Sequence, residues 1–213
     1  MASLADLRQE YSQRQLTLQE VAGDPFTQFD RWFQEALKAE VPEPNAMTLS
    51  TVDASGQPHS RIVLLKALED QRFVFYTNYT SRKGQQLAQN PKVAITFLWL
   101  ELERQVCITG TAQKVDPATS DAYFHSRPRG SRIGAWVSPQ SQTIPDREFL
   151  EQREAEFASK FEGKEVERPA HWGGYAVSPS QVEFWQGRPS RLHDRVVFTL
   201  DDQGQWTRER LAP

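Results

Sequence analysis

The sequence predicts a mainly β fold, an antiparallel barrel with flanking helices, and three observations lead to it. About eight short apolar or alternating segments are bounded by turn residues, a pattern typical of antiparallel strands. Helical segments are interspersed among them. The chain has 213 residues, of which 11% are aromatic, so it is too aromatic for a disordered protein and long enough to bury one core.

The first element is expected to be a helix that begins after Asp24, an N-cap residue followed by Pro25 at the first helical position. Apolar residues then recur at helical spacing until Pro42 stops the run. A Ser55-Gly56 turn next predicts a hairpin. The strands expected in this part of the chain are residues 46–53, 59–65 and 73–76.

Ser81 is positioned to cap a short helix that runs to about Gln89. A second helical stretch, residues 117–137, contains Pro128 and is expected to break there. A charged helix is expected at residues 146–161. The remaining strands are predicted at residues 93–100, 105–112, 174–177, 182–185, 192–200 and 206–210.

Composition excludes several classes of protein. The net charge of −3 argues against a general nucleic-acid binder, and the longest apolar stretches are too short for a membrane-spanning helix. The polar amino terminus lacks a signal-peptide segment. The single Cys107 permits no internal disulfide and is expected to be a small core residue, while the scattered histidines predict no metal site. We therefore expect a cytoplasmic protein with no membrane, nucleic-acid or metal partner.

Basic residues are unevenly placed. Residues 122–145 contain Arg127, Arg129 and Arg132 but no acidic residue, which suggests an anionic ligand. Arginine outnumbers lysine by 18 to 7, which suits planar phosphate recognition, although a GC-rich genome would produce the same ratio.

Two cations, Arg82 and Lys83, fall in the first turn of a predicted helix, where the helix dipole favours negative charge. A bound anion would resolve that conflict, and the alternative is an exposed, solvated pair. Arg61 and Lys66 flank an apolar strand and fall on its opposite faces. They would meet at one ligand through a bulge, a strong twist or a subunit interface, and otherwise they reach solvent.

Tyr123, Arg127 and Ser131 are spaced by four residues and offer two hydroxyl groups and a guanidinium fork, a suitable phosphate clamp. The alternative is a solvated helix edge. If a strand begins at Arg191, then Arg191, His193 and Arg195 share one face and repel one another unless an anion or an electron-rich ring lies beside them. The alternative here is an ordinary half-exposed strand.

No nucleotide-binding glycine loop or nucleophile elbow is present in the sequence. Cations, hydroxyls and aromatic rings without a self-sufficient catalytic group suit a borrowed cofactor that carries phosphate.

Several motifs, taken together and in this order, resemble the pyridoxamine 5′-phosphate oxidase family. The resemblance runs from about Leu7 to the last residue. The motifs are Arg61 to Lys66, Phe75-Tyr76-Thr77-Asn78 with Ser81-Arg82-Lys83, Leu102-Glu103-Arg104-Gln105, Tyr123 to Pro128, Ile133 to Ser138, Glu183-Phe184-Trp185-Gln186, Arg191-Leu192-His193-Asp194-Arg195 and Arg210-Leu211-Ala212-Pro213. Within the signature, Arg188-Pro189 departs from the family pattern and adds a cation of no assigned role.

The resemblance implies a split β-barrel of the FMN-binding type, with residues 1–20 as a mobile N-terminal segment and residues 21–213 as a single domain. It implies a homodimer with active sites at the subunit interface. It also implies oxidation of pyridoxamine 5′-phosphate or pyridoxine 5′-phosphate to pyridoxal 5′-phosphate by FMN, with O2 as electron acceptor and H2O2 released.

The resemblance also assigns roles to residues, with Arg191 and His193 as the catalytic pair. The FMN contacts it implies are Arg61, Ile62, Val63, Leu64, Lys66, Tyr76, Thr77, Arg82, Lys83, Gln105, Gln140, Ser141, Trp185 and Arg195. The substrate contacts it implies are Arg8, Tyr11, Lys66, Tyr123, Arg127, Ser131, Arg191 and His193. Two other functions stay open: a non-catalytic flavin carrier, and an RNA-binding barrel that stacks bases on its aromatic rings.

Overall fold

The computed structural model describes residue 3 and residues 10–213. Its helices are α1 (Pro25–Lys38), α2 (Arg82–Gln89), α3 (Pro117–Ser126), α4 (Arg129–Val137) and α5 (Glu148–Lys160). Its strands are β1 (Ala46–Val52), β2 (Pro58–Leu64), β3 (Ala67–Glu69), β4 (Arg72–Asn78), β5 (Lys92–Trp99), β6 (Arg104–Lys114), β7 (Trp172–Gln186), β8 (Asp194–Leu200) and β9 (Trp206–Leu211). Short 3-10 turns form at Leu100–Leu102 and Pro189–Arg191.

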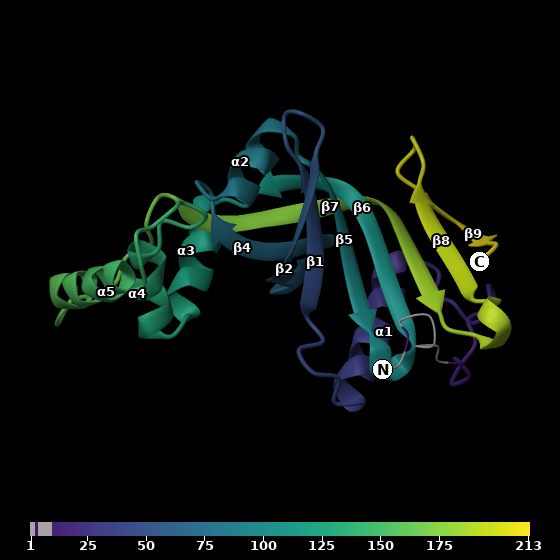
Figure 1. Ribbon diagram of the computed structural model, residues 1–213. Coiled ribbons are helices and arrows are strands. Elements are labelled where there is room, and N and C mark those ends of the chain that lie inside the picture. Colours follow the sequence, from purple (N-terminus) through teal and green to yellow (C-terminus); the bar gives the residue numbers. More distant parts are fainter. Residues whose placement is uncertain (1–2, 4–9) are drawn as a thin grey trace.

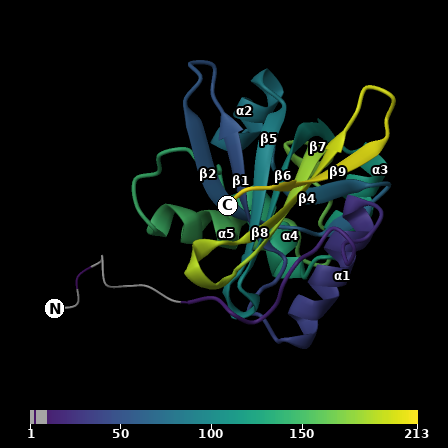
Figure 2. The ribbon, with the colours of Figure 1, turned by 90° about the vertical axis from the view of Figure 1, so that its right-hand side faces the viewer.

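The strands form one antiparallel sheet with the order β2-β1-β5-β6-β7-β4-β3, and β8 and β9 extend it from β7. The sheet curls into a half-barrel, with α1 beneath it and α3, α4 and α5 gathered at one end of β7 (Figure 1). β8 and β9 lie at the other end, and they face the viewer in Figure 2. The predicted mainly β fold with flanking helices is confirmed.

The long strand β7 organises this shape. One of its edges pairs with β6 over most of its length, while the other pairs first with β4 and then, from Gln181 onward, with β8. The sheet therefore divides at β7. We predicted two strands in this region, and that prediction is wrong because Pro179 does not interrupt the chain. Pro179 lies between the β4-paired and β8-paired residues, where its missing N–H costs no ladder hydrogen bond on that edge.

A β-bulge in β7 accompanies this passage, because consecutive residues of β6 pair with Gln181 and Pro179 and Ser180 is left over between them. The β6–β7 register shifts between Thr109 and Gly110, and the Gly110 backbone lies directly against β7. A Cβ atom on Gly110 would be 2.3 Å from the carbonyl oxygen of Ser178, so a side chain at this position does not fit. Glycine is required here by close backbone approach.

The core lies between α1 and the sheet. Asp24 caps α1 by accepting the N–H groups of Phe26 and Thr27, as predicted. The helix then places buried aromatic rings against the strands. The ring centroids of Phe29 and Phe73 lie 5.0 Å apart and those of Trp32 and Phe184 lie 5.2 Å apart, both pairs edge-on. A second, smaller cluster forms between α3, α4, α5 and the start of β7.

Most predicted elements are confirmed within one to three residues. The hairpin of β1 and β2, the Ser81 cap of α2 and the break at Pro128 between α3 and α4 are all present. The three-residue strand β3 was not predicted, because its pairing with β4 depends on tertiary contact rather than on a periodic pattern.

Candidate functional site

A cleft of about 690 Å³ opens where β2, β4, α3, α4 and the start of β7 meet. Many of the residues that the resemblance assigns to cofactor or substrate line it. These residues are Ile62, Val63, Leu64, Lys66, Tyr76, Thr77, Lys83, Tyr123, Arg127, Ser131 and Gln140.

The charge of the cleft is one-sided. Lys66, Lys83 and Arg127 line it, and none of the described residues along its wall is Asp or Glu. Burial lowers the pKa of Arg127 and of Lys83, and for Lys83 the nearby Arg61 lowers the pKa further. Within the described part of the chain, the buried Nη1 of Arg127 has no hydrogen-bond partner. Because a buried donor of this kind is costly unless it is paired, the cleft is suited to an anion.

The chain break at Pro128 builds one part of the cleft. Arg127 is the C-cap residue of α3, and Ser131 falls in the first turns of α4. Tyr123, one turn earlier, stacks on Tyr76 with 3.8 Å between ring centroids. The guanidinium of Arg127 lies 4.5 Å from the ring centroid of Trp172. The predicted clamp of Tyr123, Arg127 and Ser131 is therefore brought to one cavity, although the three residues do not share a helix.

A second polar group forms at the start of α2. Lys83 Nζ donates to Thr77 Oγ1 at 3.0 Å and to Gln140 Oε1 at 3.2 Å. Arg82 in the same turn is exposed. Arg61 does not line the cleft in this chain: its guanidinium donates to the carbonyl of Leu49 and to neighbouring side-chain oxygens. Burial and the nearby charge of Arg82 lower the pKa of Arg61, so these cations share one region.

The basic stretch at residues 122–145 divides into two roles. Arg129 donates to the carbonyl oxygens of Phe161 and Lys164, and Arg132 forms an ion pair with Glu165 at 3.0 Å. These two arginines tie α4 to the segment after α5. Arg127 is the member of the three that lines the cleft.

The other predicted residues gather at the far end of β7. The rings of Trp185 and His193 lie 4.5 Å apart, and Tyr11 packs edge-on against both, at 5.8 and 5.9 Å. We call Tyr11, Trp185 and His193 the Trp185 cluster. Gln105 is opposite Trp185 in the β6–β7 register. Arg191 is exposed nearby, in a left-handed backbone conformation with φ of 60°.

One sequence interpretation in this region is wrong. β8 begins at Asp194, so Arg191 and His193 precede the strand and do not share a strand face with Arg195. Arg195 is also neutralised, because its guanidinium donates to both carboxylate oxygens of Glu183 at 2.8 and 2.9 Å. The expected repulsion among three neighbouring cations therefore does not arise at Arg195.

The cleft and the Trp185 cluster lie at opposite ends of one strand. From Trp172 to Trp185 an extended chain covers roughly 40 Å at about 3.3 Å per residue, and Figure 1 shows β7 spanning the molecule between α3 and β8. One protomer does not bring the two groups together. Ser141, next to Gln140, is exposed and does not line the cleft, and Arg8 lies outside the described residues.

Sequence reasoning missed Trp172, whose ring lies 5.5 Å from Tyr76 and forms the floor beneath Arg127. It stands at the start of a strand without a recognisable motif, and only the fold brings it to α3. Cys107 is half-buried rather than part of the core, and burial raises the pKa of its thiol. Across residues 10–213, no helix is long and apolar enough to span a membrane, and no cluster of His, Cys, Asp and Glu could hold a metal.

The chain is similar to known protein families in two regions and to known proteins over its full length. Residues 33–160 match the family described as pyridoxamine 5′-phosphate oxidase, and residues 172–213 match the pyridoxine 5′-phosphate oxidase C-terminal dimerisation region. The pyridoxine/pyridoxamine 5′-phosphate oxidase of Cupriavidus necator is 57% identical over 213 residues, which cover 100% of both chains. That of Trichormus variabilis is 56% identical and covers 99% of both.

Solved structures agree in fold. PhzG from Burkholderia lata, solved with tetrahydrophenazine-1-carboxylic acid, superposes with a TM-score of 0.86 at 30% identity, covering 92% of this chain and 95% of that one. A Nostoc punctiforme protein described as pyridoxamine 5′-phosphate oxidase-related and FMN binding superposes with a TM-score of 0.71 at 19% identity. The match covers 91% of this chain and 100% of that one. From its matched regions and its full-length relatives, this chain belongs to the pyridoxine/pyridoxamine 5′-phosphate oxidase family of oxidoreductases.

Proposed function

We propose that this protein uses FMN to oxidise pyridoxamine 5′-phosphate or pyridoxine 5′-phosphate to pyridoxal 5′-phosphate. O2 is the final electron acceptor and is reduced to H2O2, and the amine substrate also consumes water and releases ammonia. The observation that carries this proposal is a cleft lined by Lys66, Lys83 and Arg127, in which the described residues supply no carboxylate and Arg127 Nη1 has no partner. The names of the full-length relatives support the choice of substrates.

Two groups of side chains fit two phosphates. Lys83, with Thr77 and Gln140 around its ammonium group, would hold the FMN phosphate, assisted by Arg61 and Arg82. This location also resolves the conflict of two cations at the start of α2, because an anion there is favoured by the helix dipole.

The second phosphate belongs to the substrate. Lys66, Tyr123, Arg127 and Ser131 line the same cleft and offer two cations and two hydroxyl groups. Arginine suits this role because its planar fork donates two parallel hydrogen bonds to phosphate. The stacked rings of Tyr76 and Tyr123 make the adjoining wall flat and aromatic, which favours a planar ring next to the phosphate.

We propose that the complete site forms in a homodimer, where the cleft of one protomer faces the Trp185 cluster of the other. The distance along β7 supports this arrangement, since neither the cleft nor the Trp185 cluster of one protomer contains all the assigned residues. Large apolar side chains on the surface support it as well: Ile62, at the rim of the cleft, is 64% exposed, and Leu192, beside His193, is 70% exposed. Burial of such residues between subunits is favourable.

FMN, when bound, supplies the two-electron redox chemistry. The protein residues hold the reacting carbon in place, and such positioning contributes as much as roughly 7–11 kcal/mol to lowering a barrier. Arg191 and His193 orient the substrate ring and its reacting substituent. The backbone N–H of Arg188 donates to His193 Nδ1 at 3.1 Å, so the neutral imidazole carries its proton on Nε2. His193 therefore acts as a hydrogen-bond donor through Nε2, and Nδ1 does not serve as a base.

The test begins with the purified protein. We expect a flavin absorption spectrum, and we expect aldehyde and H2O2 to form when pyridoxamine 5′-phosphate is added in air. A yellow protein that forms neither product would instead be a flavin carrier, and a colourless protein that binds single-stranded RNA would refute both.

A variant tests the role of Arg191. Arg191→Met should lower kcat sharply while FMN stays bound, because the side chain acts on the substrate rather than on the cofactor. Arg72→Met is the matched control, since Arg72 pairs with Asp70 and does not line the cleft. Unchanged kcat/KM in Arg191→Met would contradict its assigned role.

A further inference from the structure

We infer that Arg188 is a positioning residue that fastens the segment of residues 12–16 to the loop before β8, and so keeps Tyr11 beside His193. The kinetic part of this inference rests on the proposed function, and its structural part does not. Arg188 is the cation in the signature that no sequence argument explained, and its side chain is 34% exposed.

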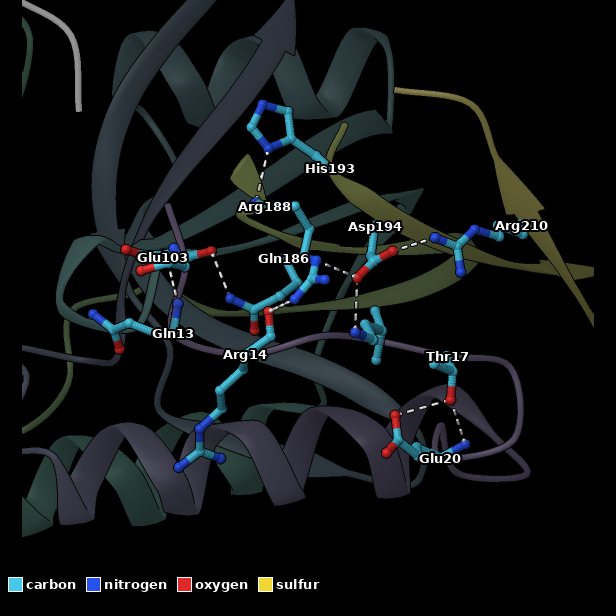
Figure 3. A network of polar contacts seen from close by, with 12 residues as sticks. Gln13, Arg14, Thr17, Glu20, Glu103, Gln186, Arg188, His193, Asp194 and Arg210 are labelled. Carbon is cyan, nitrogen blue, oxygen red and sulfur yellow. Dashed lines mark hydrogen bonds and ion pairs between the residues drawn. The ribbon is translucent and has the colours of Figure 1, made fainter. Parts of the chain in front are cut away.

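Arg188 makes three contacts, each with a different element (Figure 3). Its Nη1 donates to the carbonyl oxygen of Arg14 at 3.1 Å. Its Nε lies 3.5 Å from Asp194 Oδ2. Its backbone N–H donates to His193 Nδ1 at 3.1 Å. One residue thus connects the N-terminal segment to the residue that orients the substrate.

The segment has further anchors on the same side. Asp194 is buried, and its Oδ2 accepts the N–H of Leu16 at 3.0 Å. Glu103 Oε2 accepts the N–H groups of Ser12 and Gln13 at 2.9 and 3.0 Å. In Figure 2 the segment, drawn in purple, passes beside β8 on its way to α1.

Neutralisation of Asp194 does not account for Arg188. Arg210 already forms a close ion pair with Asp194 through Oδ1. The Arg188 contact with that carboxylate is longer, at 3.5 Å, than its hydrogen bond to the Arg14 carbonyl. The distinctive contact of the Arg188 guanidinium is therefore the one to the N-terminal segment.

The hydrogen bond between Arg188 and the Arg14 carbonyl affects the position of Tyr11, three residues before Arg14. Tyr11 rests on Gly187, where an added Cβ would lie 2.7 Å from Tyr11 Cβ and Cγ, and its ring contacts Trp185 and His193. Release of the Arg14 carbonyl would loosen this packing and open one side of His193 to water. Arg188 therefore acts on substrate binding through Tyr11.

The structural test is hydrogen exchange on the FMN-loaded, full-length protein. In Arg188→Ala, the amides of Ser12, Gln13 and Leu16 should exchange about tenfold faster, as expected for loss of one charge-assisted hydrogen bond. The exposed pair of Arg72 and Asp70 provides the control, and Arg72→Ala should leave these amides unchanged. Equal protection in Arg188→Ala and in the unmodified protein would overturn the inference.

The kinetic test is a double-mutant cycle with pyridoxine 5′-phosphate. Arg188→Ala and Tyr11→Ala should each raise KM about five- to tenfold with kcat within about twofold, and the double variant should resemble either single one. Additive effects would mean that Arg188 does not act through Tyr11. If the unmodified protein does not oxidise the substrate, the proposed function fails, while the exchange result still decides whether the fastening exists.

Discussion

Arg127 offers the sharpest test of the cleft. Its guanidinium is held over Trp172, and its buried Nη1 has no partner among the described residues. Arg127→Met keeps an unbranched apolar stem and removes the charge and the donors. Hydrogen bonds to charged groups contribute about 1.5–3 kcal/mol each, and every 1.4 kcal/mol is tenfold. Loss of one such bond to the substrate phosphate should raise KM about 10- to 150-fold.

Stability without ligand should change little, because Arg127 Nη1 donates no hydrogen bond to the described residues that could be lost. The lost contact with Trp172 is of the order of 0.5–2 kcal/mol, and relief of the buried charge opposes it. Arg127→Lys should recover part of the affinity, since it restores the charge but not the fork.

The assay is steady-state kinetics with pyridoxamine 5′-phosphate, combined with thermal unfolding and flavin content. Arg129→Met is the control from the same stretch. Arg129 donates to the carbonyls of Phe161 and Lys164, so its loss should lower stability and leave KM unchanged. A change in KM below twofold for Arg127→Met, or an effect confined to flavin retention, would refute the reasoning.

Three further predictions concern stability. Glu35→Ala removes the carboxylate that pairs with the buried Arg104 at 2.7 Å and should cost about 3 kcal/mol in denaturant unfolding; a loss below 1 kcal/mol would contradict it. Gly110→Ala forces a Cβ against the Ser178 carbonyl and should cost about 2 kcal/mol or more, whereas Gly130→Ala, in α4 with open space around it and no positive φ, is not subject to this clash. Burial raises the pKa of Tyr76 and Tyr175 to about 12, above about 10 in the unfolded chain, so the contribution of these two tyrosines to stability should be constant below pH 10 and be lost between pH 10 and 12. Tyr76→Phe should make that fall shallower, and an equal slope would count against it.

Local signals were sufficient for many of the elements. Asp24 and Ser81 are caps whose side chains accept backbone N–H groups within the first turn, so their effect is decided by neighbours in sequence. The helix breaks at Pro128 because a proline ring and its missing N–H do not fit a helix interior, which is a local property of the residue. β7 was predicted as two strands because the continuity of the strand past Pro179 depends on its pairing with β6, which lies far away in the sequence.

In the site, too, some features depend on neighbours in sequence and others on contacts between distant segments. Tyr123, Arg127 and Ser131 could be recognised as a clamp from residue type and spacing, and the fold brings them to one cleft. The roles of Arg129 and Arg132 could not be separated from that of Arg127, since their partners Phe161 and Glu165 come from another segment. The pairing of Arg195 with Glu183 was likewise hidden, because the two residues meet only when β7 and β8 pair.

The kinds of chemical group available, the presence and approximate positions of the helices, and an ordered set of motifs that identifies the family could all be read from the amino-acid sequence. These depend on side-chain chemistry and on contacts within a few residues. The three-dimensional fold was needed to show which cations are neutralised, that Trp172 lies beneath Arg127, and that the assigned residues occupy opposite ends of β7. Those outcomes depend on long-range strand pairing, because register places residues side by side whatever their separation along the chain.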